Sequence, residues 1–372
     1  MTAARFRRPA IPDVVPLLVV TRGGEVESVH RGSVAVVSED GHLLAGAGDP
    51  LQPVFLRSAA KPFQLTPFLA AGGERRFKLT TSEIALAAAS HGGEPLHTRT
   101  AARILEKGGF SAADLHCGAH APMREETARA LAFRHEKPNP LHNNCSGKHA
   151  AMLLACRMFR LDPATYYRAG HPLQRKILSV VSRMTGVPEN RIPIGVDGCS
   201  VPVHQVPLYN LALAYARLVG GRADGETAAE FAARRRIVEA MTRAPRMVAG
   251  TGRFTTNLMT EFGGALLAKE GAEGVYAVGV PHRLARALPV RGAIGIALKI
   301  EDGAERGRDA VTVEVMRQLG LASGALLANL RRLARRPVRN VRGDVVGGMK
   351  PVFSLDLFAA AGAAGEAPGR RP

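Results

Sequence analysis

The chain has 372 residues, 46% of them hydrophobic, which is enough to bury a sizeable core and allows two or three compact units. Its 40 glycines and 24 prolines follow no fixed period, which excludes collagenous and repeat proteins. The formal net charge of +18 suits a nucleic-acid partner or an arginine-rich solvated surface; we favour the surface, because Trp is absent and only 5% of residues are aromatic.

The cysteines and the hydropathy pattern indicate the compartment. The four cysteines are too scattered for a disulfide framework, and none forms a Cys-x-x-Cys pair: Cys117, Cys145, Cys156 and Cys199. No run of about 18 apolar residues occurs, and the apolar stretch at 14–20 is interrupted by proline and lacks a cleavage site. We therefore expect a cytoplasmic protein without a membrane span, and we interpret 14–20 as a first strand.

The predicted elements place strands at both ends of the chain around a helical middle. β-branched runs predict strands at 17–21 and 33–38, followed by a hairpin turn at 39–41. Apolar residues at three- and four-residue spacing predict helices near 82–90, 96–107, 124–134, 148–159, 173–185, 206–219, 226–243 and 256–269. Strand character returns at 275–280, 293–300 and 351–357, with helices between these segments.

This order predicts an α+β architecture in which strands from both termini form one sheet and a helical lobe is inserted between them. We expect residues 1–357 to form one unit, with a sheet lobe of about 1–60 plus 270–357 and a helical lobe of about 61–269. The Ala, Gly and Pro tail at 358–372 has little to bury and is expected to be disordered.

The first chemical motif is the Ser-x-x-Lys formed by Ser58 and Lys61. In a helical turn the two side chains share one face, so a neutral, buried lysine could take the proton of the serine hydroxyl. Such a motif also arises often by chance. Because Pro62 favours a first helical turn, we expect the pair to lie where the chain enters a helix.

A second serine, Ser90, begins the segment Ser90-His91-Gly92-Gly93-Glu94. The glycines could end the preceding helix and let a ligand approach the backbone. The plainer interpretation is a helix C-terminus with a solvated histidine.

Polar groups are also concentrated between 143 and 149, where Cys145 and Lys148 precede an apolar helix. Cys145 could pair with Cys199 to bind a soft metal such as zinc, although isolated cysteines are more often small buried hydrophobes. Lysine is a rare ligand, since it must lose its proton first.

The segment 248–256 is a glycine-rich turn in which Gly250 and Thr251 could offer backbone N–H groups to a carboxylate. It has neither the Walker lysine spacing nor a full dinucleotide fingerprint, so we expect no nucleotide cofactor. Lys269, at the end of the last predicted helix, is by default a solvated charge.

Taken together, the motifs resemble those of the class 3, or rhizobial-type, L-asparaginases in order and spacing from about residue 16 to 357. The matching segments are Arg-Ser-Ala-Ala-Lys-Pro-Phe, Ser-His-Gly-Gly-Glu, Cys-Gly-Ala-His, Asn-Asn-Cys-Ser-Gly-Lys-His-Ala, Val-Asp-Gly-Cys-Ser-Val-Pro, Met-Val-Ala-Gly-Thr-Gly-Arg-Phe and Gly-Ala-Glu-Gly-Val. The resemblance implies a fold like that of the serine β-lactamases and penicillin-binding proteins, with an antiparallel sheet flanked by helices.

The resemblance further implies hydrolysis of L-asparagine to L-aspartate and ammonia, and a homodimer. Ser58 would be the nucleophile activated by Lys61, with Ser90 and Lys269 as a second serine–lysine pair. A zinc ion would be held by Cys145, Lys148 and Cys199. The residues near the metal or the substrate would be Asp197, Arg57, His91 and Asn144, in addition to the turn at Gly250 and Thr251.

Two other functions remain open at this stage. A serine–lysine acyl hydrolase acting on another small amide or ester would cleave an ester reporter while leaving asparagine untouched. A basic binding protein without catalysis would bind nucleic acid with an affinity that falls steeply with salt.

Overall fold

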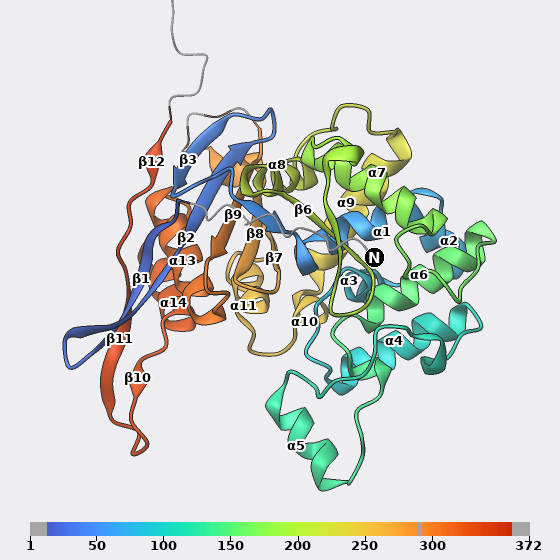
Figure 1. Cartoon of the computed structure of the whole chain (residues 1–372), viewed down its shortest axis with the longest axis horizontal. Helices are drawn as coiled ribbons and strands as arrows, with labels where there is room; N and C mark the ends of the chain where they lie inside the picture. Colours follow the sequence, from blue (N-terminus) through green and yellow to red (C-terminus); the bar gives the residue numbers. More distant parts are fainter. Residues whose placement is uncertain (1–12, 287, 289, 291, 359–372) are drawn as a thin grey trace, which may run out of the picture.

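The computed structural model describes residues 13–286, 288, 290 and 292–358. A large antiparallel sheet occupies one side and a helical lobe the other (Figure 1). The strands of the large sheet are β1 (Val15–Arg22), β2 (Glu25–Ser38), β3 (Leu43–Ala47), β7 (Leu267–Glu270), β8 (Val275–Val280), β9 (Ile294–Ile300), β10 (Val338–Arg339), β11 (Val345–Pro351) and β12 (Asp356–Leu357). The predicted tail at 359–372 lies outside the described residues.

The strand order joins the two ends of the chain. The main path of the sheet runs β10-β11-β1-β2-β9-β8-β7, and β3 pairs with both β2 and β12. β1 is thus hydrogen-bonded between β11 and β2. The α+β class, with one antiparallel sheet built from N- and C-terminal strands, is therefore confirmed, as is the turn at 39–41 that joins β2 to β3.

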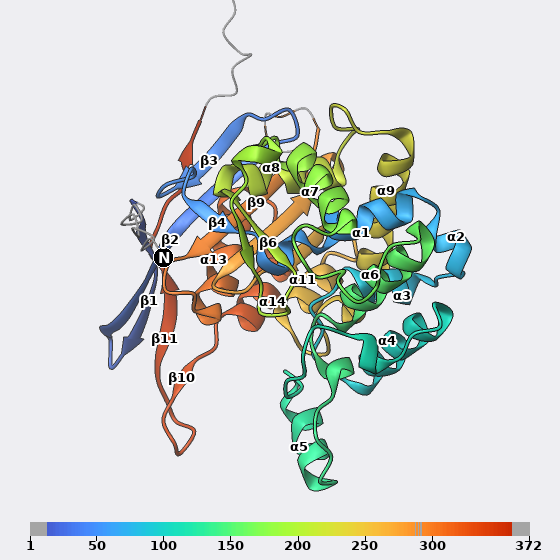
Figure 2. The same ribbon diagram turned by 45° about the vertical axis from the view of Figure 1, so that its right-hand side comes forward.

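Helices cover both faces of this sheet. Gly279 and Gly295 form a cross-strand pair under α8 (Leu208–Val219), and a Cβ on Gly295 would lie 1.8 Å from the Ala212 carbonyl oxygen. His30 on β2 projects to the opposite face because successive strand residues alternate, and there it contacts Gly307 of α13 (Glu305–Gln318). α14 (Gly324–Ala334) packs against α13 (Figure 2). The glycines allow α8 to approach the strands closely.

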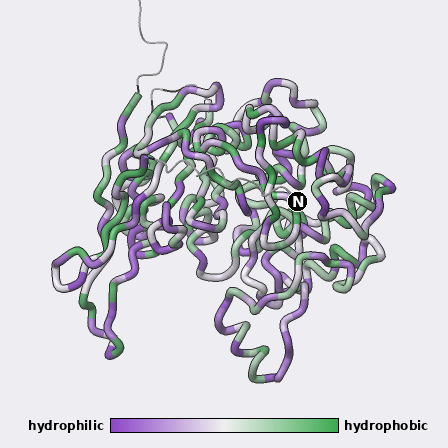
Figure 3. Tube along the Cα trace, in the orientation of Figure 1, coloured by the Kyte–Doolittle hydropathy of each residue, from purple (hydrophilic) through white to green (hydrophobic). Residues whose placement is uncertain are grey.

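The helical lobe comprises α1 (Lys61–Ala70), α2 (Gly73–Phe77), α3 (Thr81–Ala87), α4 (Pro95–Lys107), α5 (Glu125–Phe133), α6 (Ser146–Phe159), α7 (Pro172–Thr185), α9 (Ala228–Arg243), α10 (Pro245–Val248) and α11 (Phe254–Glu261). The short helix α12 (His282–Ala285) follows β8. α5 stands away from the body in both views and mixes hydrophilic and hydrophobic residues (Figures 1–3). Among the described residues, no helix is both long enough and apolar enough to cross a membrane.

A small three-stranded sheet joins the segment just before the first motif to two strands from the middle of the chain. Its strands are β4 (Pro53–Phe55), β5 (Ile194–Val196) and β6 (Pro202–Pro207), in the order β4-β6-β5. Leu56 donates its N–H to the His204 carbonyl at 2.9 Å, which fixes the backbone just before Ser58.

The prediction of one helix over 256–269 is wrong in its second half. α11 ends at Glu261, because Gly263 and Gly264 both have positive φ angles, 58° and 73°. Residues 267–270 instead form the edge strand β7, which brings Lys269 into the sheet. The predicted strand at 351–357 is also only partly right, since β11 ends at Pro351 and β12 holds only residues 356–357.

Candidate active site

Ser58 and Lys61 lie in one helical turn at the start of the helical lobe. Residues Arg57–Ala60 form a 3-10 turn, and the Lys61 N–H donates to the Ser58 carbonyl where α1 begins. Pro62 occupies the first turn of α1, as the sequence suggested. Ser58 is half-buried, whereas Lys61 is 1% exposed, so a substrate can reach the hydroxyl while the amine is shielded from water.

The Lys61 amine contacts the second serine. Its Nζ donates to Ser90 Oγ at 2.9 Å, to the Asn144 carbonyl at 3.2 Å and to the Ala89 carbonyl. In the described part of the chain, no hydrogen bond joins this amine to Ser58. The structure therefore brings Ser90, from the loop after α3, to Lys61, the lysine of the first motif.

Ser90 is held in place by its own backbone. Its N–H donates to the Val248 carbonyl at 2.9 Å, and the preceding helix α3 starts at a capping box formed by Thr80 and Glu83. α3 ends at Ala87, earlier than predicted, so Ser90 lies in a loop. This loop is buried between α6 and the segment around α10, which leaves the hydroxyl only 3% exposed.

Lys269 lies on β7, where it pairs with Ala277 of β8, and it is fully buried rather than solvated. Its Nζ donates to the Glu270 carbonyl at 2.8 Å. Burial lowers the pKa of this amine well below its usual value, and the nearby positive charges of Lys61 and Arg253 act in the same direction, against an opposing effect of Glu270. A neutral amine at this position is a proton acceptor.

Close to Lys61 and Lys269, three side chains come together: Cys145, Lys148 and Cys199. Cys145 shares a hydrogen bond with Cys199, and Lys148 Nζ lies 3.0 Å from Cys199 Sγ. The bond from Cys199, together with the positive charges of Lys61 and Lys148, lowers the pKa of Cys145 well below that of a free thiol, while the pKa of Cys199 is raised. The two thiols therefore titrate as a pair, and the lysine charges favour the thiolate at Cys145.

Arg57 and Asp197 join this cluster to the Ser58 turn. Arg57 Nε donates to Asp197 Oδ1 at 2.7 Å, and Asp197 Oδ2 lies 3.7 Å from Cys199 Sγ. Burial raises the pKa of Asp197, but Lys148 and Arg57 outweigh it and the pKa is lowered overall. Arg57 has a φ of 46°, a left-handed conformation that costs a non-glycine residue about 1–2 kcal/mol. The ion pair holds this strained residue beside Ser58.

The cluster contains donor types that zinc binds. Two thiols and an amine are soft sulfur and nitrogen donors of the type that zinc binds in tetrahedral sites. Among the described residues, no group of three or more His, Cys, Asp and Glu side chains is placed to hold a metal, so such a site needs Lys148. Burial opposes the charge on Lys148, but Cys199, Cys145 and Asp197 raise its pKa overall, so ligation would have to displace a proton.

The turn at Gly250 and Thr251 already binds a carboxylate of the same chain. The Thr251 N–H donates to Glu94 Oε1 at 2.7 Å, and its hydroxyl donates to Glu94 Oε2 at 2.7 Å. Gly250 has a φ of 121°, and a Cβ there would lie 2.6 Å from Glu94 Oε1. The N–H group that we expected to meet a substrate carboxylate therefore holds Glu94, which anchors the Ser90 loop to this turn.

His91 and Asn144 are also engaged within the protein. The His91 ring is fully buried, bonded through Nε2 to Ser146 Oγ at 2.9 Å, and accepts the Gly93 N–H at Nδ1. Burial and neighbouring positive groups lower its pKa well below the usual value, so it is neutral. Asn144 is half-buried, and its amide Nδ2 lies 3.7 Å from Met123 Sδ. Of the two, Asn144 is the one with a side chain open to a ligand.

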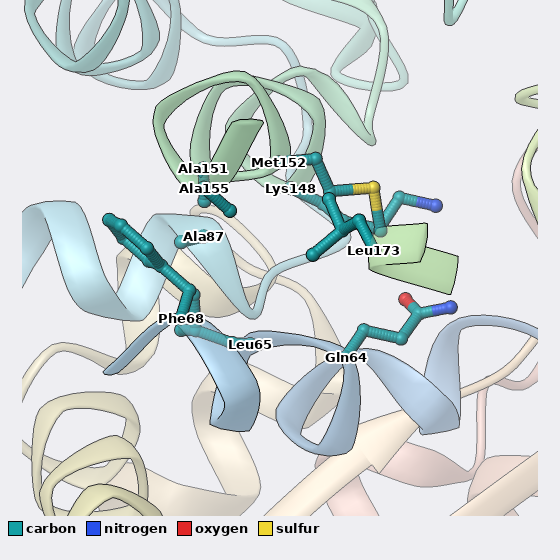
Figure 4. A pocket seen from close by; sticks show the side chains of 9 residues that line it. All are labelled: Gln64, Leu65, Phe68, Ala87, Lys148, Ala151, Met152, Ala155 and Leu173. Atoms are coloured by element: carbon teal, nitrogen blue, oxygen red, sulfur yellow. The ribbon is translucent and has the colours of Figure 1, made fainter. Parts of the chain in front are cut away.

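Two cavities lie near these residues. A void of about 10 Å³, room for about one water molecule, is lined mainly by apolar side chains, with the polar ends of Gln64 and Lys148 on one side of it (Figure 4). A cleft of about 470 Å³ is large enough for a small metabolite. Its lining includes Gly92, Thr251 and Glu270, which belong to the segments that carry Ser90 and Lys269.

Three residues of this cleft were missed by the sequence analysis: Glu94, Arg253 and Glu270. Each lies within a motif that was singled out or next to one, since Glu94 ends the Ser90 motif, Arg253 follows Gly252, and Glu270 follows Lys269. Arg253 and Glu270 form an ion pair at 2.8 Å. A polar side chain next to a motif could therefore have been identified as a candidate site residue from the sequence. The residue that it contacts could not, because it lies in another segment.

The glycine of the Asn143–His149 motif has a packing role that gives a testable prediction. A Cβ on Gly147 would lie 2.4 Å from the Leu86 carbonyl oxygen, where α6 crosses the end of α3. Gly147→Ala is expected to lower the free energy of unfolding by about 1–3 kcal/mol through overpacking, measured by urea denaturation. The control is Gly170→Ala, whose Cβ would meet nothing within 4 Å; similar losses in both variants would contradict the packing argument.

Comparison with known proteins identifies the family of the chain. A family model described as L-asparaginase II matches residues 18–351 and so covers most of the chain. The chain belongs to the L-asparaginase II family. The family resemblance predicted from the motifs is therefore confirmed.

Solved structures similar to this chain include a probable glutaminase from Bacillus subtilis complexed with 6-diazo-5-oxo-L-norleucine, at 12% identity and a TM-score of 0.36, with 79% of this chain and 86% of that chain covered. Native Mglu in the presence of 4.3 M NaCl has 16% identity and a TM-score of 0.35, with 79% and 62% covered. This chain therefore spans less than two thirds of that Mglu chain. A search of curated proteins found no match.

Proposed function

We propose that this amidohydrolase is an L-asparaginase, which hydrolyses the side-chain amide of L-asparagine through Ser58. Membership of the L-asparaginase II family supports the substrate. The observation that carries the mechanism is the buried Lys61 amine, which follows Ser58 by one helical turn and donates to Ser90 Oγ at 2.9 Å. A half-buried hydroxyl beside a shielded amine is the arrangement that serine–lysine nucleophiles need.

In the proposed reaction, Ser58 Oγ attacks the amide carbon of asparagine and its proton passes to Lys61. The tetrahedral intermediate collapses, the C–N bond breaks, and the leaving group takes a proton to depart as ammonia. This leaves an aspartyl ester on Ser58. Water then attacks the ester, its proton returns through the same amine, and L-aspartate is released with the hydroxyl restored.

The second serine–lysine pair, Ser90 and Lys269, is proposed to help accept the proton that leaves Ser58. Ser90 Oγ accepts from Lys61, and Lys269 is a buried amine whose pKa is lowered by burial and by neighbouring positive charges. Burial therefore favours the neutral, proton-accepting form of Lys269, and Ser90 accepts a hydrogen bond from Lys61, the amine proposed to take the proton of Ser58. The two serines are distinguished by access, because Ser90 is buried and Ser58 is not.

A zinc ion is proposed to be held by Cys145, Lys148 and Cys199. When bound, such an ion supplies a positive charge that polarises a carbonyl oxygen or lowers the pKa of a bound water. The residues of this chain would act around it, because Asp197 would supply a negative charge beside the ion and Arg57 holds Asp197 next to Ser58.

The metal proposal predicts a change in zinc content. Protein purified without chelator is expected to contain about one zinc per chain, and Cys145→Ser should lose most of it, because a hydroxyl is a poor substitute for a thiolate. Elemental analysis after gel filtration measures the change. Cys156→Ala is the control, since Cys156 is a buried thiol on α6 whose pKa is raised to about 12 by burial. Equal zinc in the two variants would contradict the site.

The function itself is tested by ammonia release from L-asparagine, with L-glutamine and an ester reporter assayed alongside. Asparagine-selective release by the zinc-supplemented protein is the expected result. Rapid cleavage of the ester with asparagine untouched would instead establish an acyl hydrolase of different specificity. Ammonia release from glutamine at a rate equal to that from asparagine would contradict the proposed substrate.

A further inference from the structure

The cleft of about 470 Å³ has a mixed charge that the proposed reaction leaves unexplained. Its walls carry Glu94, Arg124, Arg253, Glu270 and Arg308. Carboxylates and guanidinium groups alternate there, which suits a small ligand that carries both a positive and a negative charge. The volume lies within the range of about 300–1,000 Å³ that small-molecule sites occupy.

Two buried charged side chains in this cleft each have an atom without a hydrogen bond. Glu270 is 4% exposed; its Oε1 accepts from Arg253 Nη2 at 2.8 Å, whereas its Oε2 accepts no hydrogen bond within the described residues and lies 3.6 Å from Arg308 Nη2. Arg308 is 2% exposed; in the same part of the chain its Nη1 makes no hydrogen bond and lies 3.7 Å from Glu305 Oε1. Both atoms are thus in ion-pair range but lack a hydrogen bond, which leaves each of them able to bind a ligand or an ordered water.

The cleft adjoins the two segments that carry the second serine–lysine pair. Glu270 follows Lys269 on β7, and Gly92 of the cleft wall is two residues after Ser90. Met123 connects the cleft to the catalytic cluster, because its Sδ lies 3.8 Å from Arg253 Nη1 and 3.7 Å from Asn144 Nδ2. The cleft lining therefore comes in part from the segments that carry the groups proposed to transfer protons.

We propose that Glu270 and Arg253 bind the α-ammonium and α-carboxylate groups of the amino-acid substrate in this cleft; the assignment rests on the proposed asparaginase function. Glu270 Oε2, which lacks a hydrogen bond, accepts from the α-ammonium group. Arg253 is 20% exposed at its side chain and presents its guanidinium to the α-carboxylate. The charged end of the substrate therefore supplies the hydrogen bond that Glu270 Oε2 lacks.

Three amide substrates distinguish binding of the α-ammonium group from binding of the α-carboxylate group. Succinamate lacks the α-amino group of asparagine, and 3-aminopropanamide lacks the α-carboxylate. Glu270→Gln is expected to raise the KM for asparagine at least about tenfold, with a smaller change in kcat, while leaving succinamate hydrolysis as in wild type. Arg253→Gln should raise the KM for asparagine similarly and leave 3-aminopropanamide hydrolysis unchanged. Glu106→Gln, an exposed residue of α4 that does not line the cleft, is the control.

A merely structural role would give a different pattern. Equal losses on all three amides, or an unchanged KM for asparagine in both variants, would overturn the assignment. If Glu270→Gln does not fold, Arg253→Lys supplies the same comparison, because it keeps the charge and loses the planar two-pronged donor.

Binding to the unmutated protein separates this inference from the proposed function. Calorimetry with L-aspartate, succinate and β-alanine requires no turnover. Tighter binding of aspartate than of either analogue, reduced at least about tenfold by Arg253→Lys, supports the cleft even if no amide is hydrolysed. Hydrolysis of asparagine combined with equal binding of the three ligands would refute the cleft assignment alone.

Discussion

Replacing Ser58 with alanine is expected to reduce the rate of ammonia release from L-asparagine by about a thousandfold or more, without loss of folding. Of the two serines near Lys61, Ser58 is half-buried and Ser90 is buried, so the Ser58 hydroxyl is the one that a substrate can reach. No other atom of this turn can form the ester. The side chain is small, so its removal creates little cavity. Steady-state kinetics, with circular dichroism as the check on folding, measures the effect.

Two serines serve as comparisons for this variant. Ser182→Ala changes a half-buried serine on α7 and is expected to retain wild-type rates. Ser90→Ala should lower kcat, since Ser90 Oγ accepts from Lys61, but by less than Ser58→Ala. Near-normal turnover of Ser58→Ala together with an inactive Ser90→Ala would show that Ser90 is the nucleophile.

Lys269→Met is expected to lower kcat by about a hundredfold or more while raising the free energy of unfolding at neutral pH. Loss of a general base costs about 10²–10⁴ in rate. The stability gain follows from burial, which lowers the pKa of Lys269 in the folded state below that in the unfolded chain. Replacing this fully buried amine with an apolar side chain of similar length removes the desolvation cost that opposes folding.

The lowered pKa of Lys269 also predicts how the free energy of unfolding changes with pH. Between the lowered folded pKa and the unfolded pKa, the unfolded chain binds the extra proton, so this group makes the protein more stable as the pH rises. Denaturant titrations at several pH values up to about 10 should show that slope in wild type and a weaker one in Lys269→Met. The exposed Lys350→Met is the control. A less stable, fully active Lys269→Met would contradict both roles.

Part of the sheet could be predicted from local pattern, and the exceptions have physical causes. The strands β1, β2, β8 and β9 and the β2–β3 hairpin follow from strand-forming runs and a turn at 39–41, whereas β10 and β11 were not predicted. β7 was missed because Leu266, Leu267 and Ala268 continue the helical spacing of α11, while the positive φ angles of Gly263 and Gly264 set the actual boundary. The start of α1 was expected from Pro62, but its extent to Ala70 was not, because Pro67 lies inside the helix.

The candidate site was predictable only in its parts. The spacing of Ser58 and Lys61 gave one helical turn, but the contact from Lys61 to Ser90 joins segments far apart in sequence and depends on tertiary packing. The approach of Cys145 to Cys199 has the same origin, and the family resemblance supplied it rather than the spacing. The Glu94 bond to Thr251 was not foreseen, because periodicity and local motifs carry no information about such a pairing.

The most direct test of the central claim is to trap the covalent intermediate. Wild-type protein is mixed with L-asparagine, quenched in acid within the first turnover, and digested for peptide mass spectrometry. The account predicts an aspartyl ester on Ser58, present in wild type and absent from Ser58→Ala. An ester on Ser90, or rapid ammonia release with no ester on either serine, would contradict it.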